Sequence, residues 1–226
     1  MFGICVFGDS LTFGRGDNIN GGWSEKLKRN FESQDYYNCL YNLEVCGDTT
    51  EDILKRFDVE AKSRIRFKRE GDRYIIIISV GLNDSRLVGE DKTSQIEIKK
   101  FEENIQELIQ KAKMHIDEIV FIGLTPVDEL LTLNYEGTTF TNERVSQFNE
   151  IIKSSCQENN ILFLDMFEEF SKLNYQELLA DGLHPNPAGY EEMYKLIKEF
   201  LFKEEIEKAY ARYGKGEFIS KSKEDF

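Results

Sequence analysis

Four consecutive isoleucines, from Ile75 to Ile78, limit the kind of sheet that this chain can build. A strand with one solvated face alternates apolar and polar residues. A continuous apolar run of this length is typical of a strand that is covered on both faces. β-Branched residues also favour extended backbone. The run therefore predicts a central strand of a parallel sheet with helices on both sides.

The rest of the chain alternates short apolar segments with amphipathic ones, as such a sheet requires. The apolar segments predict strands at Gly3–Phe7, Tyr41–Val45, Tyr74–Val80, Glu118–Leu124 and Ile161–Leu164. The amphipathic segments predict helices at Trp23–Phe31, Thr50–Ile65, Ser94–Met114, Thr141–Glu158 and Pro187–Tyr210. Thr49 or Thr50 can cap the second helix, and Pro187 suits the first position of the last one. Five strands alternating with five helices predict an α/β fold, a parallel sheet wound on both sides.

Length and composition favour one folded domain. The chain has 226 residues, of which 40% are hydrophobic, enough for a sizeable core. We expect the domain to span residues 1–213 and a polar tail to follow at 214–226, after Gly214-Lys215-Gly216. The sequence leaves open whether this tail packs on its own core or contributes to a homodimer contact.

The charge excludes several classes of partner. A formal net charge of −13 repels phosphate backbones and anionic membrane surfaces, so we expect no nucleic-acid binding. No apolar run is long enough for stable membrane insertion. The start of the chain lacks the basic segment of an export signal, which predicts a cytoplasmic protein. The four cysteines have no CxxC spacing and are expected to be reduced thiols.

Cofactor motifs do not stand out in the sequence. No cluster of histidines, cysteines and carboxylates has the spacing of metal ligands. The glycines Gly14 and Gly16 do not form a dinucleotide fingerprint, and no phosphate-binding loop is present. We therefore expect neither a metal nor a cofactor.

Small or polar residues follow the predicted strands where each of them ends. Ser10 follows the first strand, Gly47 the second and Asn83 the third, and Asp181 and His184 follow the last. In open parallel sheets, binding sites lie beyond the carboxyl ends of the strands. A serine becomes a good nucleophile when a histidine takes its proton and a third group orients that histidine. These residue types therefore predict a serine-nucleophile site at this edge.

The chain resembles the GDSL family of hydrolases, also called SGNH hydrolases. Its four sequence blocks occur here in the family's order, as Gly8-Asp9-Ser10-Leu11, Gly47, Gly81-Leu82-Asn83-Asp84 and Asp181-Gly182-Leu183-His184-Pro185. The resemblance implies a three-layer αβα sandwich with a flavodoxin-like sheet of about five strands in the order 2-1-3-4-5. It also implies hydrolysis of carboxylic esters without a cofactor.

The resemblance assigns a role to each matching residue. Ser10 is expected to be the nucleophile, His184 the base and Asp181 the residue that orients His184. The N–H groups of Ser10 and Gly47 and the side-chain amide of Asn83 are expected to form the oxyanion hole. His115, the second histidine, precedes the fourth strand and should lie at the opposite edge of the sheet.

Residues that bind the substrate are predicted only from their place in the loops at this edge. Trp23, Arg86, Leu87, Leu130 and Tyr135 lie in or beside loops that should rim the site. The leucines either line an acyl pocket or pack their loop onto the domain. The substrate is expected to be a small-molecule ester, with thioesters, lysophospholipids and O-acetyl sugars as alternatives. A catalytically silent ligand-binding module on the same fold is the competing interpretation.

Overall fold

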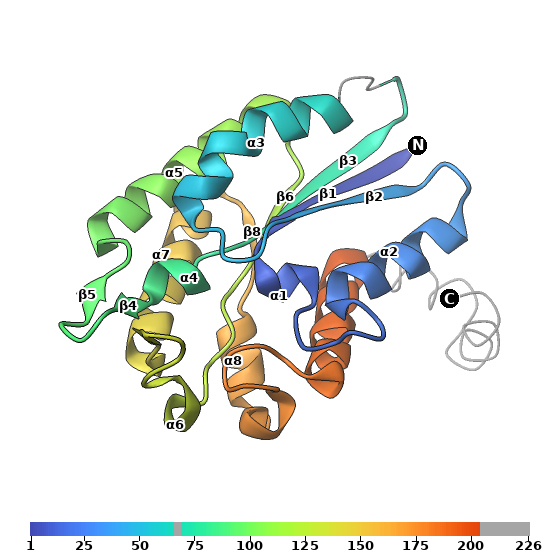
Figure 1. The fold of residues 1–226 in the computed structure, drawn as a ribbon. Helices are drawn as coiled ribbons and strands as arrows, with labels where there is room; N and C mark the ends of the chain where they lie inside the picture. Colours follow the sequence, from blue (N-terminus) through green and yellow to red (C-terminus); the bar gives the residue numbers. More distant parts are fainter. Residues whose placement is uncertain (66–68, 204–226) are drawn as a thin grey trace.

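The computed structural model describes residues 1–65 and 69–203. Its middle layer is a parallel sheet in which the order is β2-β1-β3-β6-β8 (Figure 1). The strands are β1 (Phe2–Gly8), β2 (Cys39–Glu44), β3 (Arg73–Ser79), β6 (Ile119–Ile122) and β8 (Leu162–Leu164). Counted as the five strands of this sheet, the order is 2-1-3-4-5, so the expected fold is confirmed.

Helices cover both faces of this sheet, which gives the three-layer sandwich (Figure 1). One face is covered by α3 (Thr50–Arg64), α5 (Ile98–His115) and α7 (Asn142–Asn159). The other face is covered by α2 (Gly22–Gln34), α8 (Met166–Ser171) and a helix that begins at residue 187 and is described to residue 203. The short helices α1 (Ser10–Phe13), α4 (Leu82–Ser85) and α6 (Glu129–Thr132) and the 3₁₀ helix η1 (Tyr175–Leu178) lie in the connections.

The isoleucine run contributes to two separate cores. Ile76 and Ile78 pack under α3, α5 and α7, whereas Ile75 and Ile77 pack on the opposite face under α2 and α8. All four side chains are at most 3% exposed. Successive side chains of a strand point to opposite faces, so a strand that is buried on both sides needs apolar residues at every position. The two-sided burial predicted from this run is confirmed.

Local signals fix the ends of two helices. Thr49 caps α3 in a capping box with Asp52, and the last helix begins at Pro187. The third helix begins later than predicted, at Ile98, because Thr93 and Ser94 are used in a strand.

That strand belongs to a second, antiparallel sheet that the sequence did not reveal. Its order is β5-β4-β7, where β4 is Leu87–Val88, β5 is Thr93–Ser94 and β7 is Thr138–Thr139. Strands of two residues leave too short an alternation to recognise. This small sheet ties the segment after α4 to the segment before α7, and both segments lead to the carboxyl edge of the main sheet.

Several expectations outside the sheet can be compared with the described residues. The four cysteines are free thiols. No helix among residues 1–65 and 69–203 is long and apolar enough to cross a bilayer. The expected tail at 214–226 and the end of the last predicted helix lie outside the described residues.

Candidate active site

Ser10 is presented by the turn that leads from β1 into α1. Asp9 caps this short helix, and its side chain accepts a hydrogen bond from the Leu11 N–H at 3.0 Å. Gly8 leaves room for the turn, because a Cβ there would lie 2.0 Å from Oγ1 of Thr12. The glycine is therefore required for space. Its φ is not positive, so a left-handed backbone is not the reason for a glycine here.

Ser10, His184 and Asp181 form one continuous chain of hydrogen bonds. Oγ of Ser10 lies 2.9 Å from Nε2 of His184, and Nδ1 of His184 lies 2.8 Å from Oδ2 of Asp181. Ser10 and His184 are 174 residues apart in the chain, so only the fold brings them together. The imidazole is buried, whereas the Asp181 carboxylate is about one-third exposed.

The Asp181 carboxylate is held from several sides. Oδ1 accepts hydrogen bonds from the N–H groups of Leu183 at 3.0 Å and His184 at 2.7 Å. Oδ2 accepts a third one from the Tyr135 hydroxyl at 2.7 Å, in addition to its contact with the imidazole. Burial raises the pKa of Asp181, but the hydrogen bonds from His184 and Tyr135 outweigh it and hold the pKa well below its usual range. The carboxylate is therefore ionised throughout the neutral range.

Gly47 and Asn83 lie beside Ser10 at the same edge. Gly47 adopts a left-handed backbone with φ of 89°, and a Cβ placed on it would meet no atom within 4 Å. Its N–H has no acceptor within residues 1–65 and 69–203. Nδ2 of Asn83 donates to Oδ2 of Asp9 at 3.2 Å and to the carbonyl oxygen of Asp48 at 3.1 Å. The amide is thus held in place by two acceptors below the pocket.

Two buried carboxyl groups underlie this edge. Burial raises the pKa of Asp9 to about 6, against the opposing effects of the Leu11 N–H and the charge of His184. Burial likewise raises the pKa of Asp84 to about 7, although hydrogen bonds from Thr50 oppose it. Thr50 donates its N–H at 3.0 Å and its hydroxyl at 2.5 Å to Asp84. These bonds connect the start of α3 with α4.

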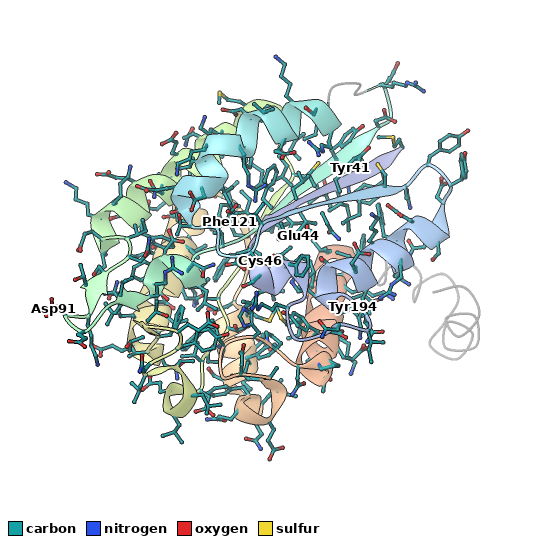
Figure 2. The ribbon with its side chains drawn as sticks, in the orientation of Figure 1. Tyr41, Glu44, Cys46, Asp91, Phe121 and Tyr194 are labelled. Carbon is teal, nitrogen blue, oxygen red and sulfur yellow. The ribbon has the colours of Figure 1, made fainter. Side chains whose placement is uncertain are left out.

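Four of the residues described so far, Ser10, Gly47, Asn83 and His184, line one pocket of about 250 Å³. Cys46, at its rim, lies just beyond the end of β2 (Figure 2). The pocket is lined by Ser10, Arg15, Cys46, Gly47, Asn83, Arg86, Tyr135, Glu136, Thr138, Phe140, Leu183 and His184. Nucleophile, histidine, glycine and amide therefore face one space.

The predicted substrate-binding residues divide into two groups. Arg86 and Tyr135 line the pocket. Leu87 and Leu130 do not, and the Leu130 side chain is 88% exposed on α6. The prediction that Trp23 rims the site is wrong, because its indole is fully buried in the core under α2. Its large apolar side chain follows the helical period of α2 and is used for packing.

Sequence reasoning missed three contributions to the site. The first is a part of the pocket wall that is formed by Glu136, from the turn before β7, and by Thr138, from β7 itself. The second is the hydrogen bond that the Tyr135 hydroxyl donates to Asp181. The third is Asp9, which holds the amide of Asn83. All three depend on loop conformation or on contacts between distant segments, and no spacing along the chain signals them.

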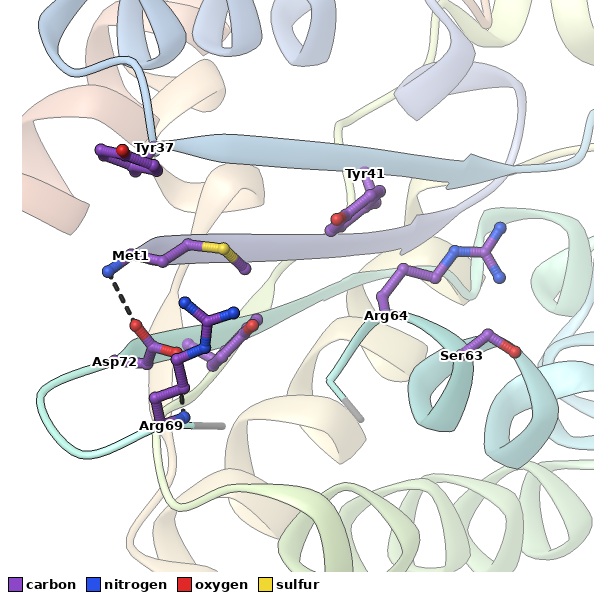
Figure 3. Close-up of a pocket in the computed structure, with 8 residues that line it drawn as sticks. Met1, Tyr37, Tyr41, Ser63, Arg64, Arg69 and Asp72 are labelled. Atoms are coloured by element: carbon purple, nitrogen blue, oxygen red, sulfur yellow. Dashed lines mark hydrogen bonds and ion pairs between the residues drawn. The ribbon is translucent and has the colours of Figure 1, made fainter. Parts of the chain in front are cut away.

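The second histidine lies elsewhere, as predicted. His115 ends α5 and its Nε2 lies 3.2 Å from Oδ1 of Asp58 on α3. A larger cavity of about 610 Å³ opens at the amino edge of the sheet, between β2 and the end of α3 (Figure 3). Within the described ranges, no group of three or more histidines, cysteines and carboxylates is arranged to hold a metal ion.

Comparisons with known proteins identify the family of the chain and its fold. The family model for the GDSL-like Lipase/Acylhydrolase family matches residues 6–192. The chain is 27% identical over 124 residues to a multidomain esterase of Ruminococcus flavefaciens. The aligned segment covers 54% of this chain but only 14% of that protein.

Solved structures share the fold over most of both chains. The lipase/acylhydrolase from Enterococcus faecalis superposes with a TM-score of 0.69 at 25% identity, over 87% of this chain and 93% of that one. An acetylxylan esterase from Geobacillus stearothermophilus superposes with a TM-score of 0.65 at 16% identity, over 88% and 93%. The family match covers all four blocks that suggested the resemblance. The chain belongs to the GDSL-like lipase/acylhydrolase family.

Proposed function

We propose that this protein hydrolyses small carboxylic esters, with Ser10 as nucleophile, His184 as general base and Asp181 as the residue that orients the base. The observation that carries this proposal is the unbroken hydrogen-bond chain from Ser10 Oγ through His184 to Asp181 Oδ2, with distances of 2.9 and 2.8 Å. A silent binding module would have no need for this alignment beside an open pocket.

In the first half of the reaction, Ser10 Oγ attacks the ester carbonyl carbon while His184 Nε2 takes the hydroxyl proton. Asp181 accepts from Nδ1, which fixes the tautomer in which Nε2 is free to accept that proton. The ionised carboxylate also stabilises the imidazolium. The C–O bond to the alcohol then breaks, and His184 returns the proton to the departing alkoxide, which leaves an acyl-serine.

The second half of the reaction repeats these steps with water. His184 takes a proton from the water molecule, whose oxygen attacks the acyl carbon, and then returns the proton to Ser10 Oγ as the acyl–serine bond breaks. Ester and water give acid and alcohol, and the enzyme is restored. Activity therefore requires neutral His184 and should fall toward acid pH.

The negative oxygen of each tetrahedral intermediate needs donors fixed in advance. The unpaired N–H of Gly47, the N–H of Ser10 and the Asn83 amide are the donors of this pocket. In the free enzyme the two amide hydrogens of Asn83 point to the Asp9 carboxyl and to the Asp48 carbonyl oxygen. In the intermediate, one of these hydrogens is shared between its protein acceptor and the oxyanion. A pocket of about 250 Å³ suits short acyl groups.

A covalent inhibitor and one variant test the proposal. A fluorophosphonate should label Ser10, as mapped by mass spectrometry of the digested protein. Ser10→Ala should fold, bind no label and lose kcat for 4-nitrophenyl acetate by roughly 10⁴-fold or more. Ser63→Ala, at the cavity of the amino edge, is the matched control and should keep full activity. Labelling of another serine, or an active Ser10→Ala variant, would reject the assignment.

A further inference from the structure

Two arginines line the pocket from separate parts of the chain. Arg15 follows α1, and Arg86 follows α4 and directly precedes β4. Both lie in the pocket that contains Ser10 and His184. The rest of the pocket wall is small, apolar or uncharged except for His184 and Glu136. The two guanidinium groups therefore decide which charge the pocket presents to a substrate.

Arg15 lines the pocket together with Cys46 and Tyr135. Burial raises the pKa of the Cys46 thiol, which lies just beyond the end of β2, and the charge of Arg15 and a hydrogen bond from it oppose this rise. The same charge also acts on Tyr135, which comes from the turn before β7. Its backbone is anchored, because its carbonyl oxygen accepts a 2.9 Å hydrogen bond from the Tyr190 hydroxyl. Arg15 thus shares the pocket with the loop after β2 and with the Tyr135 turn.

Arg86 is oriented by the second sheet. Its Nε donates to Oε1 of Gln95 at 3.2 Å, and its carbonyl oxygen accepts from the Gln95 N–H at 3.0 Å. These bonds fix the base of the guanidinium and leave the terminal nitrogens for another acceptor. Neither Arg86 nor Arg15 forms an ion pair with a carboxylate of residues 1–65 or 69–203.

The described arginines divide into two groups by their partners. Arg29, Arg69 and Arg144 resemble Arg15 and Arg86 in forming no ion pair within residues 1–65 and 69–203, but these three do not line the pocket. Arg56, Arg64 and Arg73 each pair with a carboxylate. Glu136 also lines the pocket, and its carboxylate forms no ion pair with either pocket arginine. Arg15 and Arg86 are thus distinguished by their place in the pocket beside the nucleophile, where their charges are not neutralised by an ion pair and can bind an acceptor that arrives with the substrate.

We propose that Arg15 and Arg86 form an anion subsite, and that the preferred substrates are small esters bearing a carboxylate or phosphate group. A guanidinium donates two parallel N–H bonds to such groups, which gives orientation as well as affinity. The inference rests on the ester hydrolysis proposed above. It adds that the non-reacting part of the substrate is an anion, held while the carbonyl carbon faces Ser10.

Matched esters test this subsite with few other variables. 4-Acetoxybenzoate and 4-acetoxybenzamide differ in one charge, and 4-acetoxyphenyl phosphate replaces the carboxylate with a phosphate. The readout is the ratio of kcat/KM for each anionic ester to kcat/KM for the neutral amide. Differences in the intrinsic reactivity of the esters cancel when this ratio is compared between variants.

Arg15→Gln and Arg86→Gln should each lower this ratio about tenfold, the effect of losing one charge-assisted hydrogen bond. Whichever anion gives the higher ratio in the wild type identifies the anion preferred by the subsite. Glu136→Gln should raise the ratio, because it removes a repelling charge from the pocket. Arg69→Gln removes the same charge from the exposed amino edge and should leave the ratio unchanged.

The outcomes separate the two proposals. If the wild type cleaves the neutral ester through Ser10 but the arginine variants keep the wild-type ratio, the anion subsite is wrong and the esterase proposal stands. If the wild type cleaves none of the three esters, the proposed function fails and the subsite with it. Because the neutral ester reports the folded fraction of each variant, a loss caused by misfolding changes all rates together and leaves the ratio intact.

Discussion

The two edges of the main sheet each hold a cavity, and the smaller one holds the reactive groups. The cavity at the carboxyl edge has a volume of about 250 Å³ and is lined by Ser10 and His184, which are in contact. The cavity at the amino edge has a volume of about 610 Å³ and is lined by tyrosines, two arginines and the Met1–Asp72 ion pair (Figure 3). Neither histidine reaches the larger cavity. Cavity size alone would therefore point to the edge whose cavity is lined by neither histidine.

The difference follows from the direction of the strands. In a parallel sheet all connections leave the carboxyl edge in loops that must turn back, so loops from several strands converge there. Here the loops after β1, β2 and β3 supply Ser10, Gly47 and Asn83, and the segment after α8 and η1 supplies Asp181 and His184. At the amino edge the chain passes from the helices back into the strands, and the residues there mainly pack against one another or form ion pairs.

The two histidines give the largest expected contrast between the edges. His184→Ala should lower kcat by roughly 10⁴-fold or more, because Ser10 loses the base that accepts its proton. His115→Ala should leave kcat/KM within about twofold, since its 3.2 Å hydrogen bond to Asp58 lies at the opposite edge of the sheet from Ser10. Steady-state kinetics on 4-nitrophenyl acetate measures both. Equal losses in the two variants would contradict the assignment of the reaction to the carboxyl edge.

Asn83 should give the next largest effect. Asn83→Ala removes a proposed oxyanion donor, so kcat should fall about 10²- to 10³-fold with a smaller change in KM. The control is Asn159→Ala, which removes an amide that contacts α5 far from the pocket. If the loss in Asn83→Ala appeared mainly in KM, Asn83 would bind the ground state of the substrate instead.

Tyr135 is expected to act through Asp181. Tyr135→Phe removes the 2.7 Å hydrogen bond to Oδ2 of Asp181, and kcat should fall about tenfold, the value of a bond to a charged group. The acid limb of the pH–kcat/KM profile should also shift, because the carboxylate that pairs with His184 becomes more basic. Tyr41→Phe, at the amino edge, is the control and should change neither quantity. If the pH profile of Tyr135→Phe were unchanged, Tyr135 would only line the pocket and would not act through Asp181.

Two carboxyl groups should give opposite pH dependences of stability. Burial raises the pKa of Asp84 to about 7, so the folded protein holds this proton more tightly than the unfolded chain. Its stabilising contribution is complete below about pH 4 and is lost as the pH rises through about 7, by at most ~4 kcal/mol. Asp84→Asn should remove this loss, as measured by urea unfolding at a series of pH values.

Asp72 at the amino edge provides the opposite sign. Its hydrogen bond with the N-terminal ammonium lowers its pKa, so its contribution is present above the ordinary carboxyl range and is lost as the solution is acidified. Asp72→Asn should therefore flatten the acid side of the stability profile. Equal pH profiles for wild type, Asp84→Asn and Asp72→Asn would show that neither carboxyl is perturbed in this way.

The sequence by itself determined the layers and the edge at which the site lies. Burial of Ile75 to Ile78 on both faces requires helices on both sides, and a strand that ends in small or polar residues marks the carboxyl edge. Ser10, Gly47 and Asn83 line one pocket because β1, β2 and β3 are adjacent in the sheet, whereas the long segment after β8 has to bring His184 to Ser10 through the fold. The two-sided burial and the residues at the strand ends follow from period and order along the chain, which are local information.

Only the tertiary structure decided what surrounds those residues. Trp23 and Tyr135 are both large side chains near predicted loops, yet one is buried in the core and the other donates to Asp181. Arg15 and Arg86 become neighbours of one pocket through two loops and a sheet of two-residue strands, too short to show a pattern. The positions of loop side chains depend on contacts between segments distant in the chain, and no periodicity encodes such contacts.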